Sequence, residues 1–146
     1  MIRMTETINE LGDTTMKTKL VGYWVTTIFL VFGILSGGVA ELFQRPDNVQ
    51  GIVHLGYPVY FVTLIGFWKV LGSITLLVPG FPRVKEWAYA GILFNMTGAA
   101  VSHAVCGDAA FHVVATLGFA LLAVASWWLR PQSRILGTLF RAGAKS

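Results

Sequence analysis

The chain has 146 residues, enough for one domain and too few for two of ordinary size. Hydrophobic residues make up 55% of it and charged residues only 12%, and a small soluble domain could not cover so much apolar surface. The net charge of +4 does not indicate nucleic-acid binding, because the basic residues stand in short tracts between long apolar runs. The composition therefore predicts an integral membrane protein.

The first 20 residues are expected to form a disordered or frayed cytoplasmic tail. Glu6, Glu10 and Asp13 interrupt any apolar core, so this segment does not have the pattern of a cleavable signal peptide. The apolar run that follows is expected to act as an uncleaved anchor. The predicted organisation is a cytoplasmic tail at 1–20, a four-span membrane domain at 21–129 and a basic cytoplasmic tail at 130–146.

The membrane domain is predicted to be an all-α, four-helix transmembrane bundle with up-down-up-down topology. A crossing needs roughly 20 largely apolar residues, and in lipid every backbone amide must be paired within its own segment, which favours helices. The predicted spans are Val21–Phe43, Pro58–Val78, Trp87–Val105 and Phe111–Leu129. Turns are expected at Pro79–Pro82 and Cys106–Asp108, because proline and glycine end helices.

The longer first loop is predicted to contain a short helix that lies in the membrane interface. Asp47 or Asn48 is the expected cap, and Gly56 and Pro58 end the segment.

The distribution of basic residues predicts the orientation of the bundle. Nine of them fall on one side: Arg3, Lys17, Lys19, Arg83, Lys85, Arg130, Arg134, Arg141 and Lys145. Arg45 alone falls on the other side. The positive-inside rule therefore places both termini in the cytoplasm, as in a multi-pass protein of the inner (cytoplasmic) membrane of a cell.

Polar residues at helical spacing predict a polar bundle interior. Lys69 and Asn95 lie roughly 12–14 Å from the inner ends of neighbouring antiparallel spans, so they are expected at one depth. The stripes expected to face one another comprise Gly33, Ser36, Gly37, Ala40 and Glu41; Gly66, Lys69, Gly72 and Ser73; Gly91, Asn95, Gly98 and Ser102; and His112, Thr116 and Ala123. Packing alone would explain the small residues and a hydrogen-bonded Asn95. Lys69 needs a partner or a hydrated cavity.

Glu41 is the expected counter-charge of Lys69. With the spans aligned at their ends, Glu41 would lie about 10–13 Å above Lys69. Side chains lean toward the N-terminus of their own helix, so these two lean toward each other. A direct ion pair and a water-bridged one are both consistent with the sequence.

The predicted outer mouth of the bundle holds Arg45, His54, His103, Asp108 and His112. Asp108 and His112 are four residues apart and would pair if the last helix begins early. No metal site is predicted, because the spacing of these residues matches no ligand motif. No cofactor is evident either, although a quinone or another carbonyl ligand would suit the His and Lys donors.

Several segments together resemble the DoxX-like family of small membrane proteins. They are Ser36–Leu42 (SGGVAEL), His54–Pro58 (HLGYP), Gly66–Gly72 (GFWKVLG), Lys85–Gly91 (KEWAYAG) and Gly98–His103 (GAAVSH). The resemblance covers about Tyr23 to Leu129 and implies a four-helix membrane protein of mostly unassigned activity. One relative is named for the small subunit of a thiosulfate:quinone oxidoreductase, and others are linked to membrane redox complexes. Many relatives carry the basic residue in the first span and the acidic one in the second, the reverse of this chain. The single Cys106 also excludes an intrachain dithiol mechanism.

Three hypotheses follow. The first is a protein that binds a small molecule or quinone as an accessory to membrane redox chemistry rather than as an independent enzyme, with Lys69, Glu41, Asn95, His103, Ser36, Ser73 and Ser102 as the ligand-binding candidates. The second is a component of a small-solute transporter, and the third is a purely structural or assembly protein. The expected partners are the lipid bilayer, a membrane redox protein and a second copy of the chain. Gly33 and Gly37 could support the last, although they are expected to pack within the bundle.

Overall fold

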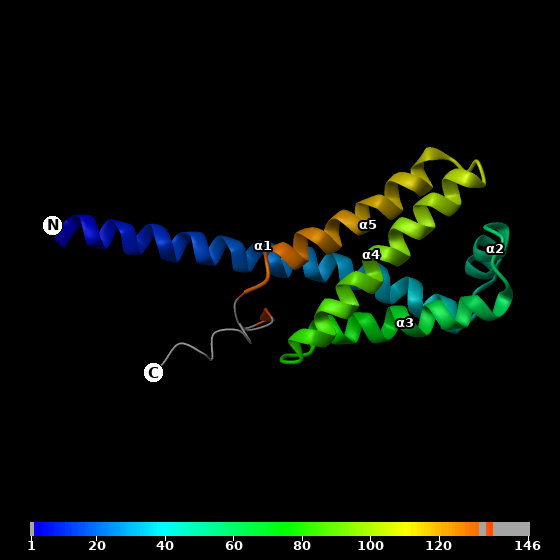
Figure 1. Ribbon diagram of the computed structural model, residues 1–146, viewed down its shortest axis with the longest axis horizontal. Coiled ribbons are helices and arrows are strands. Elements are labelled where there is room, and N and C mark those ends of the chain that lie inside the picture. The colour runs from blue at the N-terminus through cyan, green and yellow to red at the C-terminus, as the bar shows by residue number, and fades with distance from the viewer. Residues whose placement is uncertain (1, 132–133, 136–146) are drawn as a thin grey trace, which may run out of the picture.

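The computed structural model describes residues 2–131 and 134–135, and within that part of the chain all regular secondary structure is helical. In chain order the helices are α1 (Ile2–Leu42), α2 (Pro46–His54), α3 (Val59–Leu77), α4 (Pro82–Val105) and α5 (Ala110–Trp128) (Figure 1). The ends of α3 and α5 agree with the predicted spans to one residue. Most of the predicted C-terminal tail, with Arg141 and Lys145, lies outside the described residues.

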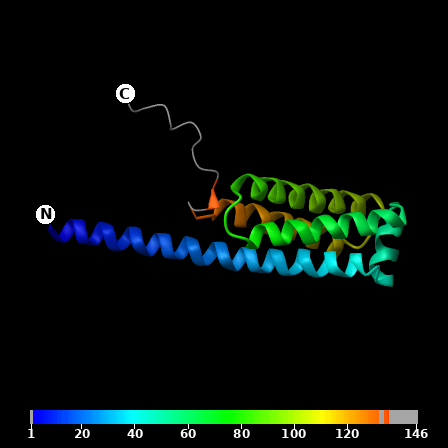
Figure 2. The same cartoon turned by 90° about the horizontal axis from the view of Figure 1, so that it is seen from below.

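The N-terminal segment corrects the prediction of a disordered or frayed tail. Residues 2–20 are the first half of α1, and they project beyond the other helices (Figures 1 and 2). The segment contains no proline, and an ion pair between Lys17 Nζ and Asp13 Oδ2 (2.6 Å) joins successive turns. Polar composition therefore argued against a span here but not against a helix.

The helices form two antiparallel pairs, α1 with α3 and α4 with α5. α1 also packs against α5, whereas α3 and α4 touch over a smaller area. The two pairs diverge toward the end of the molecule where α2 packs against the ends of α1 and α3 (Figures 1 and 2). The bundle is consequently tight at one end and opens as a wedge at the α2 end.

The short α2 is present where the sequence predicts it, but its cap differs. Arg45 occupies the N-cap position without a side-chain hydrogen bond, and Pro46 is the first helical residue. Proline suits that position because its missing N–H would have no partner there. Neither Asp47 nor Asn48 is the cap.

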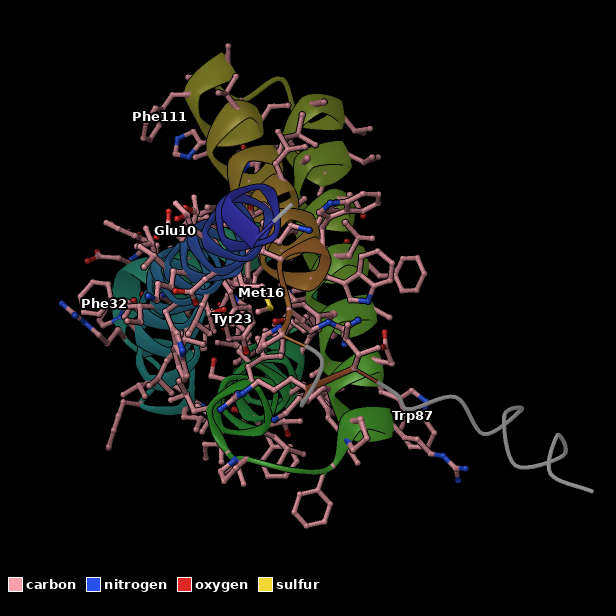
Figure 3. The ribbon with its side chains drawn as sticks, turned by 90° about the vertical axis from the view of Figure 1, so that its left-hand side faces the viewer. Glu10, Met16, Tyr23, Phe32, Trp87 and Phe111 are labelled. Atoms are coloured by element: carbon pink, nitrogen blue, oxygen red, sulfur yellow. The ribbon has the colours of Figure 1, made fainter. Side chains whose placement is uncertain are left out.

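The core between the pairs is largely apolar, so the four polar stripes that the sequence predicts do not face one another throughout the bundle. Leu30, Ile34, Leu76 and Ile92 belong to one buried cluster. Figure 3 shows Tyr23 pointing into the bundle and Phe32, Trp87 and Phe111 projecting outward, as expected for side chains that face lipid. A few hydroxyls within this core pair with one another: Ser126 Oγ lies 2.7 Å from both Thr27 Oγ1 and the Tyr89 hydroxyl.

Within the part of the chain that the structure describes, three segments are long and apolar enough to cross a membrane: Gly12–Leu42 of α1, α3 and α5. α4 is of similar length, but Asn95, Ser102 and His103 make it more polar, and it is not among them. The fourth crossing therefore stays a prediction.

Two cationic side chains, one of them fully buried, hold the tight end of the wedge together. Lys85 is 1% exposed, and its Nζ donates hydrogen bonds to the carbonyl oxygens of Thr75 (2.5 Å) and Val78 in the last turn of α3. Arg134 donates to the carbonyl oxygen of Leu76 (2.9 Å). The last carbonyls of a helix have no partner within it, so these side chains supply the missing donors. In the sequence, the charge of Lys85 predicts only the orientation of the bundle, and no motif indicates this capping role.

Candidate functional site

A buried ion pair lies at the centre of the site. Lys69 Nζ of α3 donates directly to Glu41 Oε1 of α1, which answers the question that the sequence left open. Glu41 is 4% exposed and Lys69 is largely covered. The other carboxylate oxygen, Glu41 Oε2, is buried and has no hydrogen-bond partner among the described residues.

Two glycines bring the pair together. A Cβ atom on Gly66 would lie 2.8 Å from the carbonyl oxygen of Gly38 and 2.9 Å from Glu41 Cβ, so α1 and α3 touch here backbone to backbone. Glu41 is thus level with Gly66, one helical turn from Lys69, rather than about 10–13 Å above it. Alignment of the spans at their ends was the wrong assumption, because the register is set by the glycine contact.

A cavity of about 460 Å³ lies between α3 and α4 and is called the α3–α4 cavity below. Lys69 and Asn95, predicted to lie at one depth, both border it. Its other walls are apolar and include Trp68 and Trp87, which are exposed on the side of the bundle that would face lipid. The side chain of Asn95 makes no hydrogen bond to any described residue, so its amide remains available to a ligand.

A second cavity, of about 380 Å³, fills the wide end of the wedge and is called the α2-side cavity. Glu41, Lys69, Asn95, His103 and Thr116 border it together with apolar residues of α2, α3 and α4. Lys69, Asn95 and Ile65 border both cavities, so the two spaces meet beside the ion pair.

The predicted outer mouth, at the α2 end of the wedge, contains a hydrogen-bonded cluster built around Asp108. Asp108 Oδ1 lies 2.8 Å from His54 Nε2, and its Oδ2 lies 2.6 Å from His103 Nδ1. These hydrogen bonds, first that of His103 and then that of His54, hold the pKa of the Asp108 carboxyl below its usual range. The predicted pair of Asp108 with His112 does not form, because α5 begins only at Ala110 and the His112 ring stacks on His103 instead (5.1 Å between centroids).

The remaining candidates are scattered. Ser36 is exposed and donates to the carbonyl oxygen of Gly33 (3.0 Å), so it is not part of the site. Ser73 is fully buried, has no hydrogen-bond partner among the described residues and borders neither cavity, and Arg45 is exposed. Ser102 lies 2.9 Å from the hydroxyl of Tyr57, a residue at the mouth that had not been singled out. Gly33 packs within the bundle, where a Cβ would meet the Phe119 ring at 2.2 Å.

The polar face of α4 also differs from the prediction. Gly91 and Gly98 are exposed and border the cavities, whereas Tyr89, Ile92 and Met96 occupy the packed face. The splayed α3 and α4 leave that glycine-rich face open. No group of three metal-ligating side chains is present in the described part of the chain.

The Asp108 cluster predicts a specific acid sensitivity. A depressed carboxyl pKa contributes stability that is present above its usual value of about 3.9 and is lost as the pH falls through the lower folded-state value. We therefore expect the thermal midpoint in detergent to fall more steeply in acid for the wild type than for Asp108→Asn. The test is to measure the thermal midpoints of both proteins by circular dichroism at pH values from above to below the usual carboxyl pKa. Asp47→Asn, at an exposed position of α2, is the control, and parallel curves for Asp108→Asn and the wild type would contradict the prediction.

The comparisons with known proteins fit this architecture. Residues 25–126 match the DoxX-like family, a range that includes the Glu41–Lys69 pair, both cavities and the Asp108 cluster. The chain is also similar to "Uncharacterized protein YdgD" of Bacillus subtilis (strain 168), with 27% identity over 77 residues that cover 53% of this chain and 67% of that protein. No solved structure matches it. The chain belongs to the DoxX-like family.

Proposed function

We propose that this protein is a four-span membrane protein that binds a lipophilic small molecule between α3 and α4, with the polar head of the ligand at Lys69 and Asn95. The observation that carries the proposal is the α3–α4 cavity, which is apolar along its length and has an ammonium group and an unpaired amide at one end. Its volume of about 460 Å³ falls in the usual range for small-molecule sites.

The four-span arrangement is supported by the packing of α4. This helix runs antiparallel to α5 along the bundle and is long enough to cross, at 24 residues. Its buried Lys85 donates a hydrogen bond to the carbonyl oxygen of Thr75 near the end of α3, and Arg83 lies in the same turn of α4 as Lys85. The positive-inside rule then puts the Lys85 end of the bundle in the cytoplasm and the Asp108 cluster on the outer side of the cell membrane.

The chemistry of the walls favours a ligand with carbonyl oxygens. The Lys69 ammonium has three hydrogens, of which the bond to Glu41 takes one, and the Asn95 amide can donate two. A quinone fits, because its ring oxygens accept such hydrogen bonds and its tail would lie along the apolar wall beside Trp68 and Trp87. When bound, a quinone would supply electron-transfer chemistry, and the proposal includes a redox protein of the same membrane as the partner.

Binding is preferred to transport on one structural ground. Transporters commonly bind their substrate where helices are broken at the membrane midplane. Here α3 and α4 are continuous through the level of Lys69 and Asn95.

The test is binding of a soluble quinone analogue, decylubiquinone, to the full chain in lipid nanodiscs. We expect saturable quenching of tryptophan fluorescence and a higher thermal midpoint, with at least tenfold weaker binding to Asn95→Leu. Asn95 is only partly buried and its side chain makes no hydrogen bond to a described residue, so this variant should fold. The control is Thr97→Val on the same helix, since Thr97 borders neither cavity and donates only to its own helix backbone (2.8 Å to Leu93 O).

Equal binding by Asn95→Leu and Thr97→Val would overturn the proposed site. No binding of decylubiquinone by the wild type, together with no quinone recovered by mass spectrometry from protein purified with native lipid, would overturn the quinone assignment.

A further inference from the structure

We propose that the α2-side cavity is a proton path that connects buried Glu41 with His103 at the outer mouth. This inference does not depend on a quinone or any other ligand in the α3–α4 cavity. It depends on how the buried carboxylate, the cavity and the histidine cluster are arranged.

The inner end of the path is the unpaired oxygen of Glu41. Oε1 accepts the hydrogen bond of Lys69, but Oε2 is buried without a donor among the described residues. A buried carboxylate oxygen left without a hydrogen bond is costly, and such groups in proteins are commonly satisfied by water or by a proton. Because Glu41 borders the α2-side cavity, that space can supply either.

The cavity itself suits water. Its volume of about 380 Å³ leaves room for several molecules, each of which occupies about 30 Å³ in the liquid. Polar atoms stand along it as well as at its ends. Asn95 has a free amide, and the Thr116 hydroxyl donates to carbonyl oxygens of its own helix (2.9 and 3.0 Å), which leaves its oxygen able to accept from water.

The outer end of the path is His103. Asp108 engages its Nδ1 (2.6 Å), which fixes the ring and leaves Nε2 free to exchange a proton. Asp108 in turn contacts His54 Nε2 (2.8 Å), and the side chain of His54 is 59% exposed to solvent. The cluster therefore joins the cavity to bulk water.

Few other charged groups face this path. Lys69 of α3 faces Glu41, and His112 of α5 stacks on His103 without a hydrogen bond to it. In the transfer, an N–H bond of protonated His103 breaks and an O–H bond forms on a water. The relayed proton then forms an O–H bond at Glu41 Oε2, so that one proton is lost by the imidazolium and one is gained by the carboxylate.

Infrared spectroscopy of the full chain in supported bilayers tests the path. Glu41→Gln identifies the carbonyl band of the protonated Glu41, and the deuterium shift of that band after a change to D₂O gives the rate of proton exchange. We expect His103→Phe, which keeps an aromatic ring for His112 to stack on, to slow the exchange at least tenfold. His112→Phe is the matched control and should exchange at the wild-type rate. If His103→Phe does not fold, Thr116→Val, which removes only a hydroxyl, should also slow the exchange.

A single exposed cysteine allows a second test by chemical modification. Cys106 is the only cysteine; it is exposed, and its Sγ lies 3.9 Å from the carbonyl oxygen of His54. Attachment of a bulky, membrane-impermeant thiol reagent there should slow the exchange at Glu41, and Cys106→Ser should be insensitive to the reagent.

Two results would overturn the path. One is exchange at the same rate in His103→Phe and His112→Phe. The other is the absence of any Glu41-dependent protonated band between about pH 4 and pH 9. Neither result bears on whether decylubiquinone binds at Asn95, so the two proposals can fail separately.

Discussion

Gly66→Ala is expected to lower the thermal midpoint of the protein in detergent by roughly 2–12 °C. A Cβ at this position would lie 2.8 Å from the carbonyl oxygen of Gly38 and 3.0 Å from the backbone nitrogen of Leu42. Backbone atoms cannot rotate away as a side-chain tip can, so α1 and α3 must separate. Overpacking of this kind costs about 1–3 kcal/mol, and each 1 kcal/mol corresponds to roughly 2–4 °C in a protein of this size.

Gly72→Ala is the matched control, six residues farther along the same helix. A Cβ there would meet nothing within 4 Å, and alanine favours helix over glycine. Gly72→Ala should leave the midpoint unchanged or raise it slightly. A Gly66→Ala variant as stable as Gly72→Ala would show that the close contact of α1 and α3 is not required.

Lys69→Met is expected to destabilise the bundle by about 3–5 kcal/mol, because it leaves the Glu41 carboxylate buried without its only hydrogen-bond donor among the described residues. The double variant Glu41→Leu/Lys69→Met removes both charges and should recover most of that loss. The free energy of unfolding of the wild type, both single variants and the double variant is measured by reversible unfolding in mixed micelles, followed by circular dichroism. This double-mutant cycle isolates the interaction between the two side chains.

Arg45→Met is the control for the loss of a positive charge. Because Arg45 is exposed, this substitution should change the free energy of unfolding by less than about 0.5 kcal/mol. If the effects of Glu41→Leu and Lys69→Met simply add, the two residues do not stabilise one another. In that case Lys69 would be satisfied mainly through the cavities.

The partners in the ion pair were predictable from the sequence, but their register was not. A lysine in an apolar run requires a counter-charge, and the lean of side chains along a helix pointed to Glu41. The relative shift of α1 and α3 depends on which glycines meet, and the sequence offers several at helical spacing. Only the structure shows that Gly38 and Gly66 are the two in contact.

The outer mouth was harder to predict because its contacts join residues far apart in the chain. The i, i+4 rule suggested Asp108 with His112, yet Asp108 lies before the start of α5 and contacts His54, 54 residues earlier. Lys85 was missed for a similar reason. Its charge suggested a surface position, whereas the uncapped carbonyls at the end of α3 gave it a buried one.

Because the two helix pairs are close at one end and apart at the other, a small rotation at the narrow end becomes a larger displacement at the wide end. Lys85 and Arg134 fasten the narrow end like a pivot, while α2 and the Asp108 cluster span the wide end. An arm of 19 residues, the length of α3, is about 28 Å long, so a swing of roughly 0.1 radian moves its far tip by about 3 Å. A movement too small to disturb the pivot would therefore change the opening at His54 by the width of a water molecule.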